Sequence, residues 1–309
     1  MIFQGILIGL GTAFCYGSAD VLATIVSRRL GILTTLFLSH LLGLPFMFIF
    51  LAFAWRPLAL TPQALLQSLP LGLMLGLLVT IGYFAFYRGL ELGPLAIVSP
   101  ITSIDGAITV LLAVLIFHES LDTLKIMALI ILFLGIIFVS LEGTSPLAFL
   151  HTLRMASFAK GGTRWALVAM IAFGFGLLGI GLATKTASWF LPIFWIRIFS
   201  TLAITSIWLW QHVKSRLGRL STTYSGNEGQ NSWPLNIGLA ILIGMLDSGA
   251  LLLYSFNTQF ASTGIAAAVG SCFVLFPLFF GTVVLHEQLA KHQVMGIGLV
   301  LCGLVLLGY

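Results

Sequence analysis

The chain has 309 residues, of which 59% are hydrophobic and only 7% are charged. Soluble domains carry about 25% charged residues, so this chain has too few charges to cover a water-exposed surface, and we expect lipid around most of it. The net charge of +5 does not indicate a nucleic-acid partner, because the 14 Lys and Arg residues are scattered between apolar runs and form no basic stripe.

Ten apolar runs are long enough to cross the hydrocarbon core as helices, which takes about 20 residues each. The first run starts near the N-terminus without a basic segment or a clear cleavage site, so we interpret it as a membrane helix rather than a signal peptide. The runs cover residues 3–26, 31–54, 66–89, 94–117, 124–142, 164–185, 190–212, 235–257, 263–285 and 290–308. They predict an all-α membrane protein with about ten transmembrane helices.

The chain contains an internal repeat with a constant offset, which places position 117 on position 285. Segment 117–121 reads FHESL and segment 285–289 reads LHEQL, and each precedes the last helix of its half. The same offset pairs Gly76 with Gly244, Phe86 with Tyr254, Lys125 with Gln293 and Gly135 with Gly303. Five helices in each copy give the two copies opposite orientations. Inverted repeats of this kind recur in secondary transporters, with the binding site between them near the membrane midplane.

A polar segment near the middle of the chain separates the two copies. We predict a first five-helix repeat over residues 1–142, a connecting loop over 143–163, and a second five-helix repeat over 164–309. A second polar segment, residues 214–234, is expected to be a loop inside the second repeat.

Several motifs resemble the EamA family of the drug/metabolite transporter superfamily. The endings Leu115–Leu121 and Val284–Leu289 look like the family's apolar run followed by Gly-Glu, a polar residue and Leu, with His in place of Gly. Gly135 and Gly303 fit the glycine of the last helix in each repeat. The segment 16–18 reads Tyr-Gly-Ser where the family often has Trp-Gly-Ser.

The resemblance covers nearly the whole chain and implies transport of small metabolites, often efflux of amino acids or related compounds. Members often carry a proline near the position of Gly106, which this chain lacks. The family also has a basic residue in the second helix, where this chain has His40.

Five ionisable residues fall well inside the predicted helices, where each costs about 2.5–3.5 kcal/mol on insertion scales and should face a cavity or another such group. They are Asp20, His40, Asp105, Arg197 and Asp247. Arg197 could hold a carboxylate or phosphate of the substrate, or bridge helices or reach the interface. His40 could bind substrate or be a hydrogen-bonded packing residue.

Asp105 and Asp247 are candidates for binding a proton or a substrate ammonium group, because a carboxylate exposed alternately to two sides can couple proton movement to transport. Asp105 or Asp247 could instead be the structural partner of Arg197. Asp20 shares a helix face with Tyr16. Four more aromatic residues could line a cavity or pack in the core or interfacial belt: Tyr83, Tyr87, Trp195 and Tyr254. Glu119 and Glu287, at helix ends, are expected to be caps or topology features.

These features favour a secondary transporter in the plasma membrane that moves a small polar metabolite by alternating access, with a proton as candidate coupling ion. The alternatives are a membrane enzyme acting on a lipid-linked substrate, or a receptor or scaffold. No Walker A motif or HExxH motif occurs, and the three cysteines form no CxxC or Cys/His cluster. We therefore expect no enzyme activity, no cofactor and no metal.

Two arguments predict opposite orientations in the membrane. Alternate loops carry ten Lys and Arg residues on one side and three on the other when Arg197 is left out. The positive-inside rule would then place both termini outside the cell. The family resemblance implies both termini inside, so the orientation stays open at this point.

Overall fold

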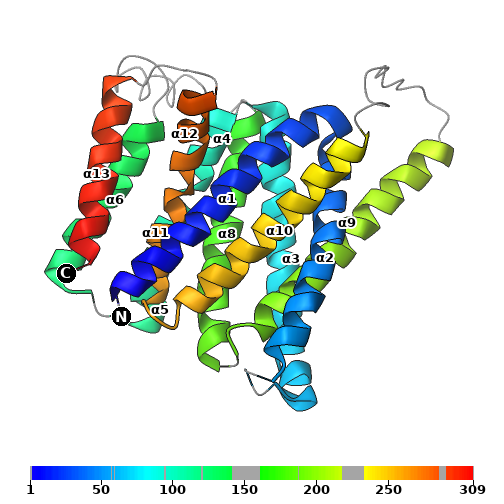
Figure 1. Cartoon of the computed structure of the whole chain (residues 1–309), viewed down its shortest axis with the longest axis horizontal. Coiled ribbons are helices and arrows are strands. Elements are labelled where there is room, and N and C mark those ends of the chain that lie inside the picture. The colour runs from blue at the N-terminus through cyan, green and yellow to red at the C-terminus, as the bar shows by residue number, and fades with distance from the viewer. Residues whose placement is uncertain are drawn as a thin grey trace.

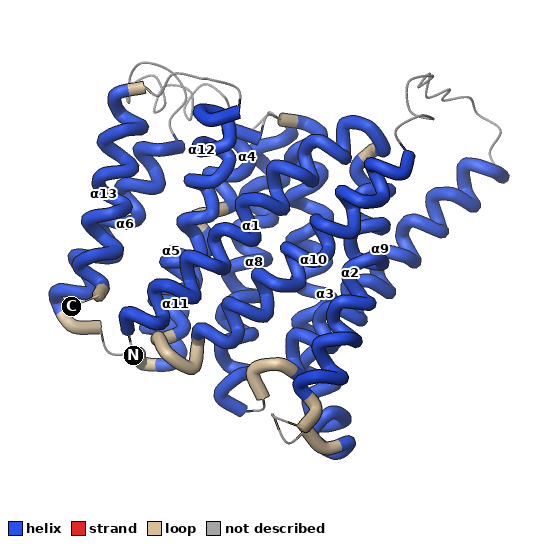
Figure 2. The backbone as a smooth tube through the Cα atoms, viewed as in Figure 1, coloured by secondary structure: helices blue, strands red, loops and turns tan. Residues whose placement is uncertain are grey.

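The structure, a computed structural model, describes residues 2–56, 58, 60–93, 95–119, 121–140, 161–186, 188–217, 233–284 and 290–308. In these ranges it is helical, with short connecting turns and no strand (Figures 1 and 2). The elements are α1 (Ile2–Leu30), α2 (Ile32–Ala54), α3 (Pro62–Leu92), α4 (Leu95–Thr102), α5 (Asp105–Phe117), α6 (Thr123–Ser140), α8 (Gly161–Thr186), α9 (Leu191–Leu217), α10 (Trp233–Asn257), α11 (Thr263–Gly270), the 3-10 helix η2 (Ser271–Val274), α12 (Leu275–Val284) and α13 (Lys291–Leu307).

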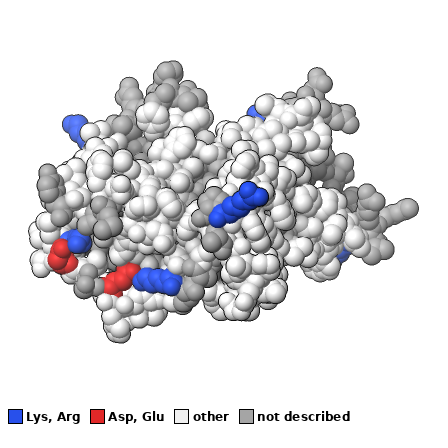
Figure 3. Space-filling model, turned by 60° about the horizontal axis from the view of Figure 1, so that its bottom comes forward, with Lys and Arg blue, Asp and Glu red and all other residues white. Residues whose placement is uncertain are grey.

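The predicted all-α membrane fold is confirmed. Among the described residues, seven helical segments are long and apolar enough to cross a membrane, and α5, α6 and α13 are shorter apolar helices. The outer surface is apolar, as lipid requires: Phe53 on α2 is 77% exposed and Leu66 on α3 is 66% exposed. Figure 3 shows few charged side chains on an otherwise uncharged face.

The fourth and ninth predicted runs are interrupted helices rather than continuous ones. The fourth is divided into α4 and α5 by a turn at Ser103 and Ile104. The ninth passes from α11 through η2 to α12. The repeat offset places Ser103 on Ser271, so the two interruptions lie at matching positions in the two copies.

The first interruption arises without the family's proline. The Gly106 N–H donates to the Asp105 carboxylate at 2.6 Å. A side-chain acceptor thus replaces the carbonyl that would take this N–H in a continuous helix. The local sequence Ser-Ile-Asp-Gly therefore ends one helix and starts the next.

The packing of α6 against α13 follows the two-fold relation between the repeats. A Cβ added at Gly135 would lie 2.6 Å from the Val300 nitrogen, and one added at Gly303 would lie 2.9 Å from the Leu132 nitrogen. The repeat offset that pairs the two glycines also pairs Leu132 with Val300. Both glycines are therefore needed for close backbone approach, and the two contacts are copies of each other.

The two halves interlock instead of lying side by side as separate bodies. From the first half, α3 packs on α8 and α9, α1 and α2 pack on α10, and α5 packs on α11. The pair α6 and α13 lies at one edge, and both chain ends lie at the same end of the bundle (Figure 1). The interior between the interlocked helices is where the candidate site lies.

Candidate functional site

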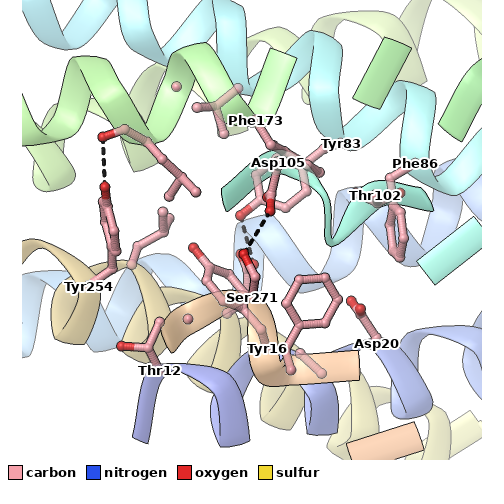
Figure 4. Close-up of a pocket in the computed structure, with 18 of the residues that line it drawn as sticks. Thr12, Tyr16, Asp20, Tyr83, Phe86, Thr102, Asp105, Phe173, Tyr254 and Ser271 are labelled. Carbon is pink, nitrogen blue, oxygen red and sulfur yellow. Dashed lines mark hydrogen bonds between the residues drawn. The ribbon is translucent and has the colours of Figure 1, made fainter. Parts of the chain in front are cut away.

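A cavity lies between the two halves, and the empty space between atoms there amounts to about 910 Å³, open solvent included. Its lining comes from α1 to α5 in the first half and from α8, α10, α11 and η2 in the second. On α1 the lining residues run from Thr12 to Asp20, and on α8 from Phe173 to Ile180, close to the middle of each helix. The cavity therefore lies near mid-depth of the helical bundle, and Figure 4 shows part of its lining.

The two repeats contribute matching positions to this cavity. Phe86 and Tyr254 both line it, and the repeat offset pairs them. The same offset pairs Val79 with Asp247, which also both line it. The cavity is therefore built on the symmetry of the repeat, while its polar groups differ between the halves.

Asp247 on α10 is held by one residue from each half. Tyr83 on α3 donates its hydroxyl to one carboxylate oxygen at 2.7 Å, and the Arg197 guanidinium on α9 donates to the other. Arg197 also donates to the Ser39 carbonyl oxygen on α2 at 3.1 Å and is only 1% exposed. This network joins four helices and neutralises the Asp247 charge.

Eight of the ten predicted site residues line the cavity, and the other two do not. Those eight are Tyr16, Asp20, His40, Tyr83, Tyr87, Asp105, Asp247 and Tyr254. Arg197 lies behind the wall, against Asp247. Trp195 faces α3 instead, where its indole N–H donates to the Leu65 carbonyl oxygen at 2.9 Å and its Cβ fills the space left by Gly72.

Asp105 connects the two helix interruptions. Its Oδ1 accepts from the Gly106 N–H at 2.6 Å and from the Ser271 hydroxyl at 3.3 Å. Figure 4 shows the Asp105 and Ser271 side chains pointing toward each other. Ser271 is the first residue of η2, so a carboxylate of the first repeat lies at the interruption of the second.

Asp20 and His40 line the cavity, and each has a hydrogen-bond acceptor without a partner. The Asp20 carboxylate takes part in none of the hydrogen bonds or ion pairs found among the described residues. His40 Nδ1 lies 3.1 Å from the Leu36 carbonyl oxygen, which can only accept, so Nδ1 carries the proton in the neutral ring. His40 Nε2 is then an acceptor, and it is buried without a partner.

Sequence reasoning missed several lining residues, including Thr12, Ser39, Phe86, Thr102, Phe173 and Ser271. Most are small or apolar residues with no charge to single them out. Two signals could have found some of them. Phe86 is the repeat partner of Tyr254, and Ser271 is the repeat partner of Ser103 beside Asp105.

Glu119 caps a helix that belongs to the other half. Its carboxylate accepts from the backbone N–H groups of Thr263 and Gly264, at 3.0 and 3.2 Å, at the start of α11. Lys185 at the end of α8 lies 3.4 Å from the same carboxylate. Negative charge at a helix N-terminus is stabilising. The matching residue Glu287 lies outside the described residues.

Within the described part of the chain, no three His, Cys, Asp or Glu side chains are grouped closely enough to hold a metal ion.

Comparisons with known proteins agree with the repeat and the fold. The profile of the EamA-like transporter family matches residues 3–141 and 160–309. The uncharacterized protein MJ1333.1 of Methanocaldococcus jannaschii is 29% identical over 137 residues, which are 44% of this chain and 96% of that protein. A solved crystal structure superposes with a TM-score of 0.68 at 14% identity, covering 98% of this chain and 96% of that one, which shows a shared fold. The two family matches, together spanning nearly the whole chain, place this protein in the EamA-like transporter family of integral membrane proteins.

Proposed function

We propose that this protein is a secondary transporter of the plasma membrane that exports a small polar metabolite by alternating access. The observation that carries this proposal is the central cavity, which both repeats line at matching positions. In inverted-repeat transporters the substrate site lies at the repeat interface near the midplane, and one repeat rocks against the other around it.

The position of the cavity favours transport over catalysis on a lipid-linked substrate. An enzyme of that kind would need its site near one leaflet, where the reactive headgroup lies. The lining residues instead lie near the middle of α1 and α8, and on α10 they run from Ile243 near the middle toward Tyr254. A site at this depth is accessible to a solute that crosses the membrane.

Gly270 offers a way to fill the cavity without disturbing the helices. It lines the cavity, its backbone is helical with φ −56° and ψ −38°, and an added Cβ would meet only Thr12 Cγ2 at 3.7 Å. The variant Gly270→Leu should therefore fold while its side chain occupies the substrate volume. Gly238→Leu on the outer face of α10, where an added Cβ has nothing within 4 Å, is the matched control.

The test is metabolite profiling of the medium around cells expressing the original chain, Gly270→Leu, Gly238→Leu or an empty vector. We expect one compound or a related group to accumulate outside with the original chain and with Gly238→Leu, and to stay at vector level with Gly270→Leu. If the profiles are identical while all three proteins are folded and abundant in the membrane, the export proposal is wrong.

A further inference from the structure

We propose that the cavity binds an organic cation through its protonated amine, with Asp20 and Asp105 as acceptors. This inference rests on the proposed transport function and names the substrate class for it.

The unpaired charged groups on the cavity lining are carboxylates, which accept hydrogen bonds. The Asp20 carboxylate has no bonded partner in the described part of the chain, and Asp105 uses only Oδ1, for two neutral donors. A primary ammonium group supplies three N–H donors, which suits such a set of acceptors.

The charges of the cavity also favour a cation. Its described lining contains three aspartates and no Lys or Arg. Arg197 neutralises only Asp247, from behind the wall, and no ion pair of the described residues involves Asp20 or Asp105. Two carboxylates inside a membrane protein need a proton or another cation to balance them. A substrate carboxylate would find no Lys or Arg side chain in the described lining to pair with.

Aromatic rings form much of the remaining wall. Tyr16, Tyr83, Phe86, Phe173 and Tyr254 all line the cavity. Figure 4 shows these residues arranged around the Asp105–Ser271 pair, with Asp20 beyond Tyr16. A cation is attracted to the face of such rings, more strongly where water is excluded. The rings would also cover the apolar body of the ligand, so an amine carrying an aromatic or branched apolar group fits best.

Four probes built on one phenyl ring test charge and hydrogen bonding separately: benzylammonium, benzyltrimethylammonium, benzyl alcohol and benzoate. Isothermal titration calorimetry would use the full-length protein in detergent. We expect benzylammonium to bind at least about tenfold more tightly than benzyl alcohol, which is about 1.4 kcal/mol, and benzoate not to bind. Benzyltrimethylammonium keeps the charge but has no N–H donor, so it should bind more weakly than benzylammonium.

Asp20→Asn and Asp105→Asn should each weaken benzylammonium binding at least about tenfold. Neither change strands a charged partner, so both variants should keep the Tm of the original chain. Asp122→Asn is the control, because this carboxylate caps α6 through the Lys125 N–H, far from the cavity lining.

Three results would overturn the cation proposal: equal or tighter binding of benzoate, no saturable binding of benzylammonium at millimolar concentration, or unchanged affinity in both aspartate variants. Export of a metabolite that Gly270→Leu abolishes but Asp20→Asn and Asp105→Asn leave intact would also overturn it, while the transport proposal stands. If the chain binds benzylammonium selectively but exports nothing, the cation proposal stands and the transport proposal is wrong.

Discussion

Arg197 on α9 and Asp247 on α10 form a buried ion pair whose arginine is 1% exposed and whose carboxylate forms part of the cavity wall. Tyr83, from the first half of the molecule, donates a hydrogen bond to the same carboxylate. A membrane protein has little water with which to solvate either charge alone, so each residue depends on the other.

Removing one member of this pair should therefore be costly. Asp247→Asn and Arg197→Met should each lower the free energy of unfolding by about 3–5 kcal/mol, because each leaves a lone buried charge or an unmatched donor set. The double variant should recover part of this loss, since no unpaired charge remains. Denaturant unfolding of all four proteins in detergent gives the coupling energy. A single variant as stable as the original would contradict this structural role.

Gly244 should not tolerate a methyl group. A Cβ there would lie 2.2 Å from the Ser39 carbonyl oxygen, where α10 crosses α2. The same carbonyl oxygen accepts a hydrogen bond from the Arg197 guanidinium. We expect Gly244→Ala to cost about 1–3 kcal/mol of stability through overpacking. Gly249→Ala on the same helix is the control, because an added Cβ has nothing within 4 Å. Equal Tm values for the two variants would show that the helix crossing is looser than described.

Glu119 should stabilise the junction between the two halves. Glu119→Gln removes the charge that faces two N–H groups at the start of α11 and Lys185, so we expect a loss of about 1–2 kcal/mol. Glu91→Gln is the matched control: Glu91 is 48% exposed and pairs with the equally solvated Arg88, an arrangement worth about 0–1 kcal/mol. Thermal unfolding of both variants makes the comparison, and a smaller effect at Glu119 than at Glu91 would refute it.

The placement of basic residues predicts the orientation. Among the described residues, excluding Arg197, seven lie at the end of the bundle opposite the chain termini: Arg28, Arg29, Arg88, Arg164, Lys214, Arg216 and Lys291. Three lie at the other end: Arg56, Lys125 and Lys185. The positive-inside rule then predicts that both termini face outward.

A fusion of alkaline phosphatase to the C-terminus should therefore be active when the protein is expressed in a bacterium, because that enzyme needs an oxidising compartment to form its disulfides. A fusion after Gly31, at the opposite end, should be inactive. The reverse pattern would agree instead with the expectation from the family resemblance that both termini face the cytoplasm.

The helix count and the repeat could be predicted from the sequence because length, hydropathy and a constant repeat offset are local or periodic signals. The interruptions at Ser103 and Ser271 could not, because hydropathy does not register which N–H groups a side chain such as Asp105 accepts. The apolar runs there continue on both sides.

The candidate cavity residues were predictable to the extent that a charge inside a helix must face something other than lipid. That rule does not choose the partner. Asp105 and Asp247 were equal candidates for pairing with Arg197, and only the crossing of α9 and α10 selects Asp247. For a similar reason the sequence leaves both cavity lining and core packing open for Trp195. It lies two positions before Arg197, so it points to a different side of the same helix and packs against α3.

Some positions that correspond in the two halves carry different residues, and this difference has a consequence for the proposed transport cycle. If the halves were identical, exchanging their conformations would give the same binding site facing the opposite side of the membrane. Here Asp247 occurs where the other half has Val79, and Tyr254 where it has Phe86. In the proposed alternating-access cycle, the inward-facing and outward-facing forms would therefore offer chemically different surroundings to the same substrate. Its affinity would then differ between the two sides, and a solute could be captured at low concentration on one side and released at higher concentration on the other when an ion gradient drives the cycle.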